Sequence, residues 1–226
     1  MSIFLVGGGT APAAESEFLA EIRLVAEERA ELAGADRASA VPVLWAIGAN
    51  AAPLVTAAQA AGIRVVDGAS AEVSTGTAHG VLVADERGNA LELTTNDAER
   101  IRDLVGGGAP YLGHGGGAAI AGDVCLASGS EIGGVSVGPA GTPGEVTAAP
   151  GLGLIDLCLE ADPIAGGTLP RLIAVIEAGM VPQALAVDAD TALVIGPGAL
   201  RVLGRGSVWQ VSAADRGVTV ATIAAE

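Results

Sequence analysis

The sequence contains no lysine. All eleven basic residues of the 226-residue chain are arginines, against 26 aspartates and glutamates, which gives a formal net charge of −15. Such a surface repels nucleic-acid phosphates and anionic lipids, so we expect neither a nucleic-acid nor a membrane partner. The exclusive use of arginine is typical of a bacterium with a GC-rich genome. These features describe the surface and the source of the chain, and not its activity.

Aromatic residues, cysteines and histidines are also scarce. Aromatics make up 2% of the chain, so the core must be aliphatic. Two cysteines are too few for a disulfide framework, and two isolated histidines offer no zinc-ligand spacing. No apolar run reaches the roughly 18 residues needed to cross a bilayer, and the N-terminus lacks a basic region typical of signal peptides. We therefore expect a cytoplasmic protein with reduced thiols, without a metal and without a cofactor.

Short apolar runs alternate with helical segments through the first half of the chain. The runs are typical of buried parallel strands and cover 3–6, 41–47, 63–66, 81–84 and 111–112. Helical spacing predicts helices over 15–32, 51–61, 96–105 and 168–178. Strand-like runs at 184–187, 192–195, 200–203 and 207–211 predict a C-terminal antiparallel meander. We expect a single α/β domain over residues 1–226, with a mostly parallel open sheet flanked by helices.

The segment 110–120 has the layout of a nucleophile elbow, in which an apolar strand leads through a sharp glycine turn into a helix of small residues. In Gly-X-Ser-X-Gly enzymes the middle residue is the nucleophile, but here that place is taken by Gly115, which has no side chain. Backbone N–H groups at the start of a helix attract anions. Candidate ligand-binding residues are therefore Gly113, His114, Gly115, Gly116 and Gly117. Alternatively, glycines occur here only because the turn requires positive φ values, which glycine adopts at little cost.

Four segments, in order, resemble the serine peptidase family of dipeptidase E (α-aspartyl dipeptidase) and cyanophycinase. They cover residues 3–9, 110–119, 150–154, and 186–194 together with 204–209. The resemblance spans nearly the whole chain. It implies the class I glutamine amidotransferase-like fold and a hydrolase ancestry.

Three departures from the family pattern concern the catalytic machinery. The family's serine falls on Gly115, and the region 155–162, where its catalytic histidine is expected, contains none. The family's glycine-rich oxyanion loop falls on the charged segment 85–89. Because the loss of one triad member already costs several powers of ten in rate, these departures predict that ordinary serine peptidase chemistry is lost.

Other residues could carry chemistry in their place. His114 is either a relocated base or a side chain packed beneath the turn. Asp156, Glu160 and Asp162 form either an acid–base group or a solvated loop of an acidic protein. Cys158 lacks a visible partner base for a nucleophilic role, Cys125 is expected to face the core from the helix after the elbow, and His79 is expected in a solvated loop.

Two hypotheses follow from the sequence. In the first, the protein is a pseudoenzyme, a binding or partner subunit that retains the pocket for a small amino-acid or peptide-like ligand. It would form a homodimer, or a heteromer with an active homologue or a pathway enzyme. In the second, it is a repurposed enzyme that acts on an amino-acid or peptide intermediate of a biosynthetic pathway by acid–base chemistry without a serine.

Overall fold

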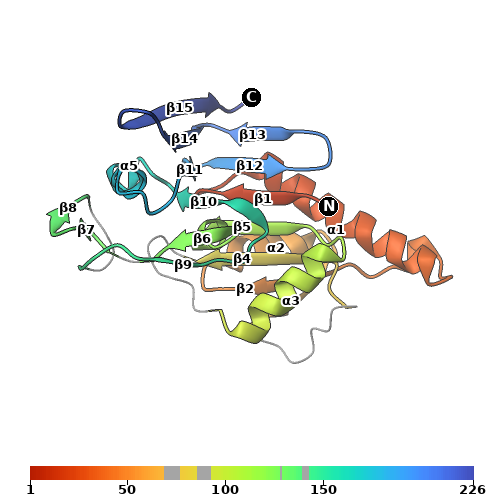
Figure 1. The fold of residues 1–226 in the computed structure, drawn as a ribbon. Coiled ribbons are helices and arrows are strands. Elements are labelled where there is room, and N and C mark those ends of the chain that lie inside the picture. The colour runs from red at the N-terminus through yellow and green to blue at the C-terminus, as the bar shows by residue number, and fades with distance from the viewer. Residues whose placement is uncertain (69–76, 86–92, 128, 139–142) are drawn as a thin grey trace.

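The computed structural model of the chain describes residues 1–68, 77–85, 93–127, 129–138 and 143–226 (Figure 1). A seven-stranded sheet forms its centre, in the order β13-β12-β1-β5-β4-β2-β3. Strands β1 to β5 run parallel to one another, whereas β12 is antiparallel to β1 and β13 is antiparallel to β12. The strands are β1 (Ile3–Val6), β2 (Val43–Ile47), β3 (Arg64–Asp67), β4 (Gly80–Asp85), β5 (Tyr111–Gly115), β12 (Thr191–Ile195) and β13 (Leu200–Gly204).

Helices cover both faces of this sheet. On one face, α1 (Pro12–Leu32) and α2 (Ala52–Ala60) bury aliphatic residues against β1, β2, β4 and β5. On the other face lies α3 (Thr95–Gly106), whose Ile101 and Leu104 are buried in a separate cluster (Figure 1). Helix α1 begins at Pro12, three residues before the expected start, because proline is well suited to the first helical position.

A second sheet packs beside α3 on the same face. Its order is β15-β14-β11-β10-β6-β9, and β10 runs parallel to both β6 and β11. The last helix, α5 (Leu169–Glu177), covers the far side of this sheet and closes a third cluster. The strands are β6 (Gly122–Leu126), β9 (Ala148–Pro150), β10 (Ile155–Ala161), β11 (Gln183–Val187), β14 (Ser207–Ala213) and β15 (Val218–Ala224); a separate hairpin joins β7 (Glu131–Ile132) and β8 (Val135–Ser136).

The expected α/β architecture and the antiparallel C-terminal strands are confirmed. The structure adds that these strands are divided between the two sheets, since β12 and β13 extend the first sheet while β11 and β14 belong to the second. It also adds β10 and β15, which we did not predict as strands. The helices of the described residues are too short or too polar to cross a membrane.

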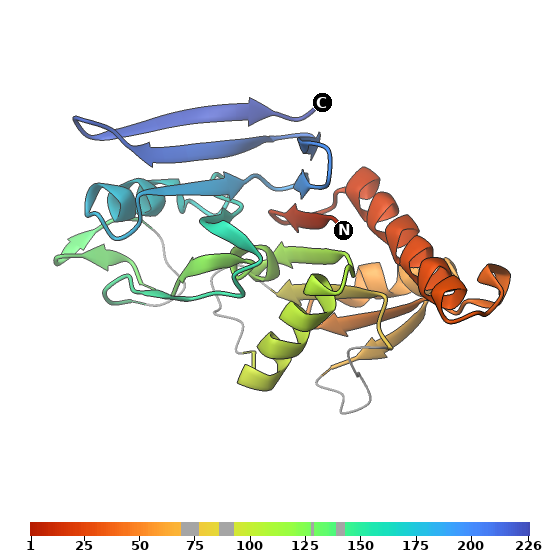
Figure 2. The same ribbon diagram turned by 45° about the vertical axis from the view of Figure 1, so that its right-hand side comes forward.

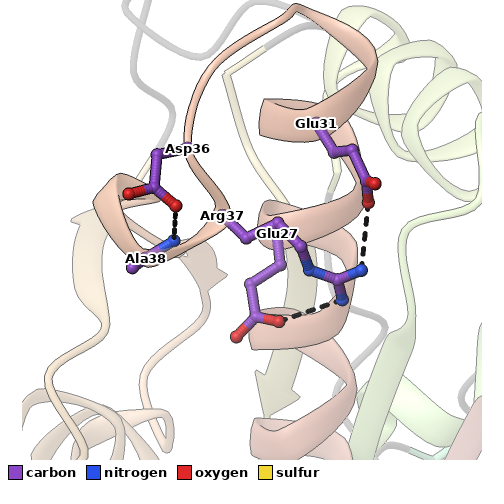
Figure 3. A network of polar contacts seen from close by, with 5 residues as sticks. All are labelled: Glu27, Glu31, Asp36, Arg37 and Ala38. Carbon is purple, nitrogen blue, oxygen red and sulfur yellow. Dashed lines mark hydrogen bonds and ion pairs between the residues drawn. The ribbon is translucent and has the colours of Figure 1, made fainter.

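A small polar network holds the chain where it leaves α1 (Figure 3). The Arg37 guanidinium contacts the carboxylate of Glu27 at 3.2 Å and that of Glu31 at 3.0 Å. The Asp36 carboxylate accepts a hydrogen bond from the Ala38 N–H at 3.0 Å and so begins the short 3-10 helix η1 (Arg37–Ser39). These contacts hold the segment after α1 against that helix before the chain enters β2.

Candidate functional site

The predicted elbow joins β5 to α4 (Gly116–Ala119). Gly115 lies at the turn with φ 57° and ψ −116°, a conformation that side chains with a Cβ adopt only under strain. The sharp turn is confirmed. The helix after it is a single turn, however, and the chain continues directly into β6, so Cys125 lies on a strand and not on a helix.

Close backbone packing accounts for three glycines of the elbow. A Cβ atom on Gly113 would lie 2.5 Å from the carbonyl oxygen of Gly117, and one on Gly117 would lie 1.9 Å from that of Val83. A Cβ atom on Gly115 would lie 2.4 Å from the carbonyl oxygen of Asp85 on β4. Contacts this short exclude any side chain unless the strands move apart. Anion binding by this turn therefore stays a prediction.

The buried Tyr111 hydroxyl fixes the same turn from below. It donates a hydrogen bond to the Gly117 carbonyl oxygen at 2.7 Å. Burial raises the pKa of Tyr111 far above its usual range, so the phenol remains a neutral donor. This bond ties the start of β5 to α4, and the strained Gly115 lies between the two bonded residues.

His114 extends from β5 toward the glycines that follow β1. Its Nε2 lies 2.9 Å from the carbonyl oxygen of Gly9, so Nε2 must carry the hydrogen, because a carbonyl can only accept. The other ring nitrogen, Nδ1, is buried without a hydrogen-bond partner among the described residues. Among the described residues, the imidazole is thus fixed by a single hydrogen bond, which Nε2 donates.

A cavity of about 420 Å³ opens at the carboxyl ends of β1, β2, β4 and β5, beside His114. This edge of a parallel sheet is where α/β proteins commonly bind ligands, and the volume suits a small molecule. Its polar lining comes from Thr10 and Glu15 near the start of α1, from Asn50 after β2, and from His114; its apolar lining includes Leu54, Leu82 and Leu112.

Gly115 does not line this cavity. Gly115 is absent from its described lining, and a Cβ there would meet the backbone of Asp85. His114 occupies the cavity wall one residue earlier. His114 is therefore not packed beneath the turn, and its role as a relocated base or proton donor stays a prediction. The rest of the expected oxyanion loop, residues 86–89, lies outside the described residues.

The acidic group Asp156, Glu160 and Asp162 does not form a solvated loop. Residues 155–161 form strand β10, in which Asp156 is exposed and Glu160 is buried. Asp162 follows the strand with φ 50° and is 1% exposed. The expected loop is wrong because β10 enters the second sheet between β6 and β11, where parallel pairing requires an extended chain.

Glu160 is part of a buried ion pair with Arg171 of α5. The Arg171 Nη2 lies 2.8 Å from the Glu160 carboxylate, and both residues are less than 10% exposed. Burial raises the pKa of Glu160, and the charge and hydrogen bond of Arg171 oppose that rise. This contact ties α5 to β10, so a structural role explains Glu160.

Cys158 and His79 also have structural surroundings. Burial raises the pKa of the Cys158 thiol to about 12, which leaves almost no thiolate at neutral pH. Cys158 and Asp156 line a smaller cavity of about 220 Å³, together with residues that include Asp123, Pro182 and Gln183. His79 is half-buried and not in a solvated loop, since its Nδ1 accepts a hydrogen bond from the Val43 N–H at 3.1 Å.

Three polar residues of the larger cavity were missed from the sequence: Thr10, Glu15 and Asn50. Glu15 accepts a hydrogen bond from the Ala11 N–H at 3.0 Å, and Thr10 donates its N–H to the Asp190 carboxylate at 2.8 Å. Thr10 and Asn50 follow β1 and β2 within four residues, and Glu15 lies in the first turn of α1, nine residues after β1. Their common position at the carboxyl ends of β1 and β2 was the signal that could have identified them.

Known structures share this fold over nearly the whole chain. A peptidase from an acI-B1 actinobacterium aligns with a TM-score of 0.61 at 15% identity, covering 99% of this chain and 94% of that one. A putative peptidase E protein from Listeria monocytogenes aligns with a TM-score of 0.51 at 14% identity, covering 90% and 98%. Neither the family models nor the curated protein sequences yield a match. The chain thus has the α/β fold of peptidase E structures.

Proposed function

We propose that this protein is a peptidase E-like pseudoenzyme, a subunit that binds a small amino-acid or peptide-like ligand without hydrolysing it. The main support is the geometry at Gly115, where the position of a nucleophile's Cβ is 2.4 Å from the Asp85 carbonyl oxygen. Restoring a serine would therefore require the backbone to move. The chain's two histidines add support, since His79 bonds to Val43 and His114 bonds to Gly9.

The ligand site of this proposal is the 420 Å³ cavity beside His114. The Glu15 carboxylate suits a protonated amino group, while Asn50 and Thr10 offer hydrogen bonds of either direction. An apolar wall of Leu54, Leu82 and Leu112 suits a short aliphatic portion. A free amino acid or a dipeptide combines these features within the available volume.

Binding and hydrolysis are tested on the same sample. Calorimetric titration with aspartyl dipeptides and free amino acids should detect a ligand, while the recovered dipeptide stays intact by chromatography. At about 100 times the dissociation constant, that ligand should stabilise the fold by about 2.7 kcal/mol. Glu15→Gln should weaken binding, whereas Glu28→Gln, on the exposed side of α1, should not. Turnover of an aspartyl dipeptide by the pure protein would contradict the proposal.

A repurposed enzyme is the second candidate, and the joint presence of His114 and Glu15 in one cavity favours it. In this case His114 transfers a proton to or from a bound amino-acid or peptide intermediate. The test is an assay in which the protein converts a candidate intermediate into a product. Loss of that product in His114→Gln, but not in His79→Gln, would support the repurposed enzyme. Unchanged product in both variants would exclude His114 as the acid or base.

A further inference from the structure

Strand β15 forms an exposed edge of the second sheet. It pairs with β14 on one side only, and Figures 1 and 2 both show it along the outer margin of the described structure with no element beyond it. Six of its seven residues are exposed, including Val220 at 40% and Ile223 at 43%. An open edge presents unpaired backbone N–H and C=O groups that can pair with another strand.

The sequence of β15 carries none of the features that usually protect an edge. Val-Thr-Val-Ala-Thr-Ile-Ala has no charge, no proline and no glycine, and consists largely of β-branched residues. The other three edges of the two sheets differ. β3 is four residues long with Arg64 and Asp67 at its ends, and β9 has three residues and ends at Pro150. β13 carries Arg201 and receives a hydrogen bond from the Glu226 N–H at the Val202 carbonyl.

The hydrogen bonds to β14 identify the groups that face outward. The N–H of Ala225 bonds to Gly206, and the N–H of Ala214 bonds to Gly217, so the residues of β15 that bond to β14 are the odd-numbered ones. In an antiparallel ladder these alternate with residues whose backbone groups point the opposite way. The outward-facing residues are Val218, Val220, Thr222 and Ala224.

We propose that β15 pairs antiparallel with β15 of a second copy of this chain across a two-fold axis at Ala221. This register overlaps the full strand, places Val220 opposite Thr222 of the partner subunit, and uses all four outward-facing residues. The result is one continuous sheet through both copies. Each copy uses its open edge once, so the assembly closes as a dimer.

Charge supports a second copy as the occupant. Two molecules of net charge −15 repel each other over most of their surface, and β15 gives them a neutral stretch on which to meet. The same register brings Arg216, in the turn before β15, next to Glu226 of the partner subunit. Both side chains are exposed. The pair occurs twice by symmetry, once at each end of the shared ladder.

The oligomeric state of the full chain tests this interface. Light scattering after gel filtration should give twice the monomer mass of 21.9 kDa. Val220→Lys places two like charges near the axis and should raise the dimer dissociation constant by about tenfold or more. Val220→Pro removes an outward N–H without touching the ladder to β14 and should act in the same direction. Val135→Lys, at a valine of β8 that is 64% exposed, adds the same charge and should leave the dimer unchanged.

Two further variants test the register. In a Cys125→Ser background, Ala221→Cys should form an intermolecular disulfide on mild oxidation, because the axis brings it opposite its own copy. Thr219→Cys, two residues along the same face, should not. Arg216→Glu should weaken the dimer, and the additional change Glu226→Arg should restore it. A monomeric wild type at about 100 μM, or a dimer that survives Val220→Lys in a cooperatively folded variant, would overturn the proposal.

Discussion

The Cα of Gly115 is held so close to β4 that a Cβ would lie 2.4 Å from the carbonyl oxygen of Asp85. The two residues are register partners in the parallel pairing of β4 and β5. The ladder thus continues to the glycine of the sharp turn. This relationship makes residue 115 part of the packing of the central sheet.

Gly115→Ser should therefore destabilise the protein without creating a peptidase. Strained backbone and the close carbonyl predict a loss of about 1–3 kcal/mol in the free energy of unfolding. Gly106→Ser is the control, because a Cβ there meets no atom within 4 Å. Urea unfolding measures the stability of each variant, and an aspartyl-dipeptide assay measures its peptidase activity. A Gly115→Ser variant with unchanged stability and clear hydrolysis would disprove this account of the elbow.

Arg171→Met should destabilise the protein by about 3–5 kcal/mol, because it leaves the Glu160 carboxyl buried without its cation. The loss should shrink as the pH is lowered. Without Arg171, the pKa of Glu160 rises further above its unfolded value, so the folded state takes up a proton more readily and becomes less unfavourable in acid.

Two comparisons give the Arg171 prediction its control. Replacing both partners, as Glu160→Leu with Arg171→Met, should cost much less than Arg171→Met alone, because no charge is then left buried. Arg201→Met breaks the exposed pair with Glu17 and should change stability by about 0–1 kcal/mol. Equal losses in Arg171→Met and Arg201→Met would contradict a buried ion pair.

His79 should make stability depend on pH. Burial, and then the positive charges of Arg29 and Arg64, lower its pKa, and its Nδ1 must be free of a proton to accept the Val43 N–H. Its contribution is therefore complete above the unfolded pKa of about 6.5 and is lost as the pH falls toward the lower folded pKa. His79→Asn, whose side-chain oxygen can accept the same bond, should lose less stability between about pH 7.5 and 5.5. Identical pH profiles from chemical unfolding would refute this.

Cys158 should be unreactive in the folded protein. Its thiol has a pKa of about 12 because it is buried and lies near Glu160, and only the thiolate reacts. Iodoacetamide at about pH 8 should therefore modify Cys158 in urea but not under native conditions, as peptide mass spectrometry can show. Native labelling at the rate of an unfolded control would indicate an accessible thiolate and reopen a nucleophilic role.

Much of the fold could be predicted because it depends on local pattern. The apolar runs of β1, β2, β4 and β5 and the helical spacing of α1 and α3 each reflect neighbours in sequence. β10 escaped prediction because Asp156, Cys158 and Glu160 interrupt its apolar residues on one face. Glu160 is accommodated because Arg171 approaches it from α5, whereas Asp156 is exposed. β15 escaped because its boundary depends on pairing with β14.

The candidate site likewise has features that the sequence could predict and features that only the tertiary structure reveals. The elbow, the absence of a serine at position 115 and the small number of histidines could be read directly from the sequence. The acidic group and Cys158 were candidates only because they are close in sequence. The structure separates them into the exposed carboxylate of Asp156, the ion pair of Glu160, the buried carboxylate of Asp162 and a buried thiol.

By itself, the sequence determined the α/β alternation, the acidic surface and a glycine turn without a nucleophile, because each depends on residue type and short-range order. Only the tertiary structure decided that Glu15, Asn50 and His114 share one cavity and that Asp85 closes the space beside Gly115. These arrangements depend on which strands become neighbours. Strand order brings together residues that lie tens of positions apart in the chain, and no local pattern records that distance.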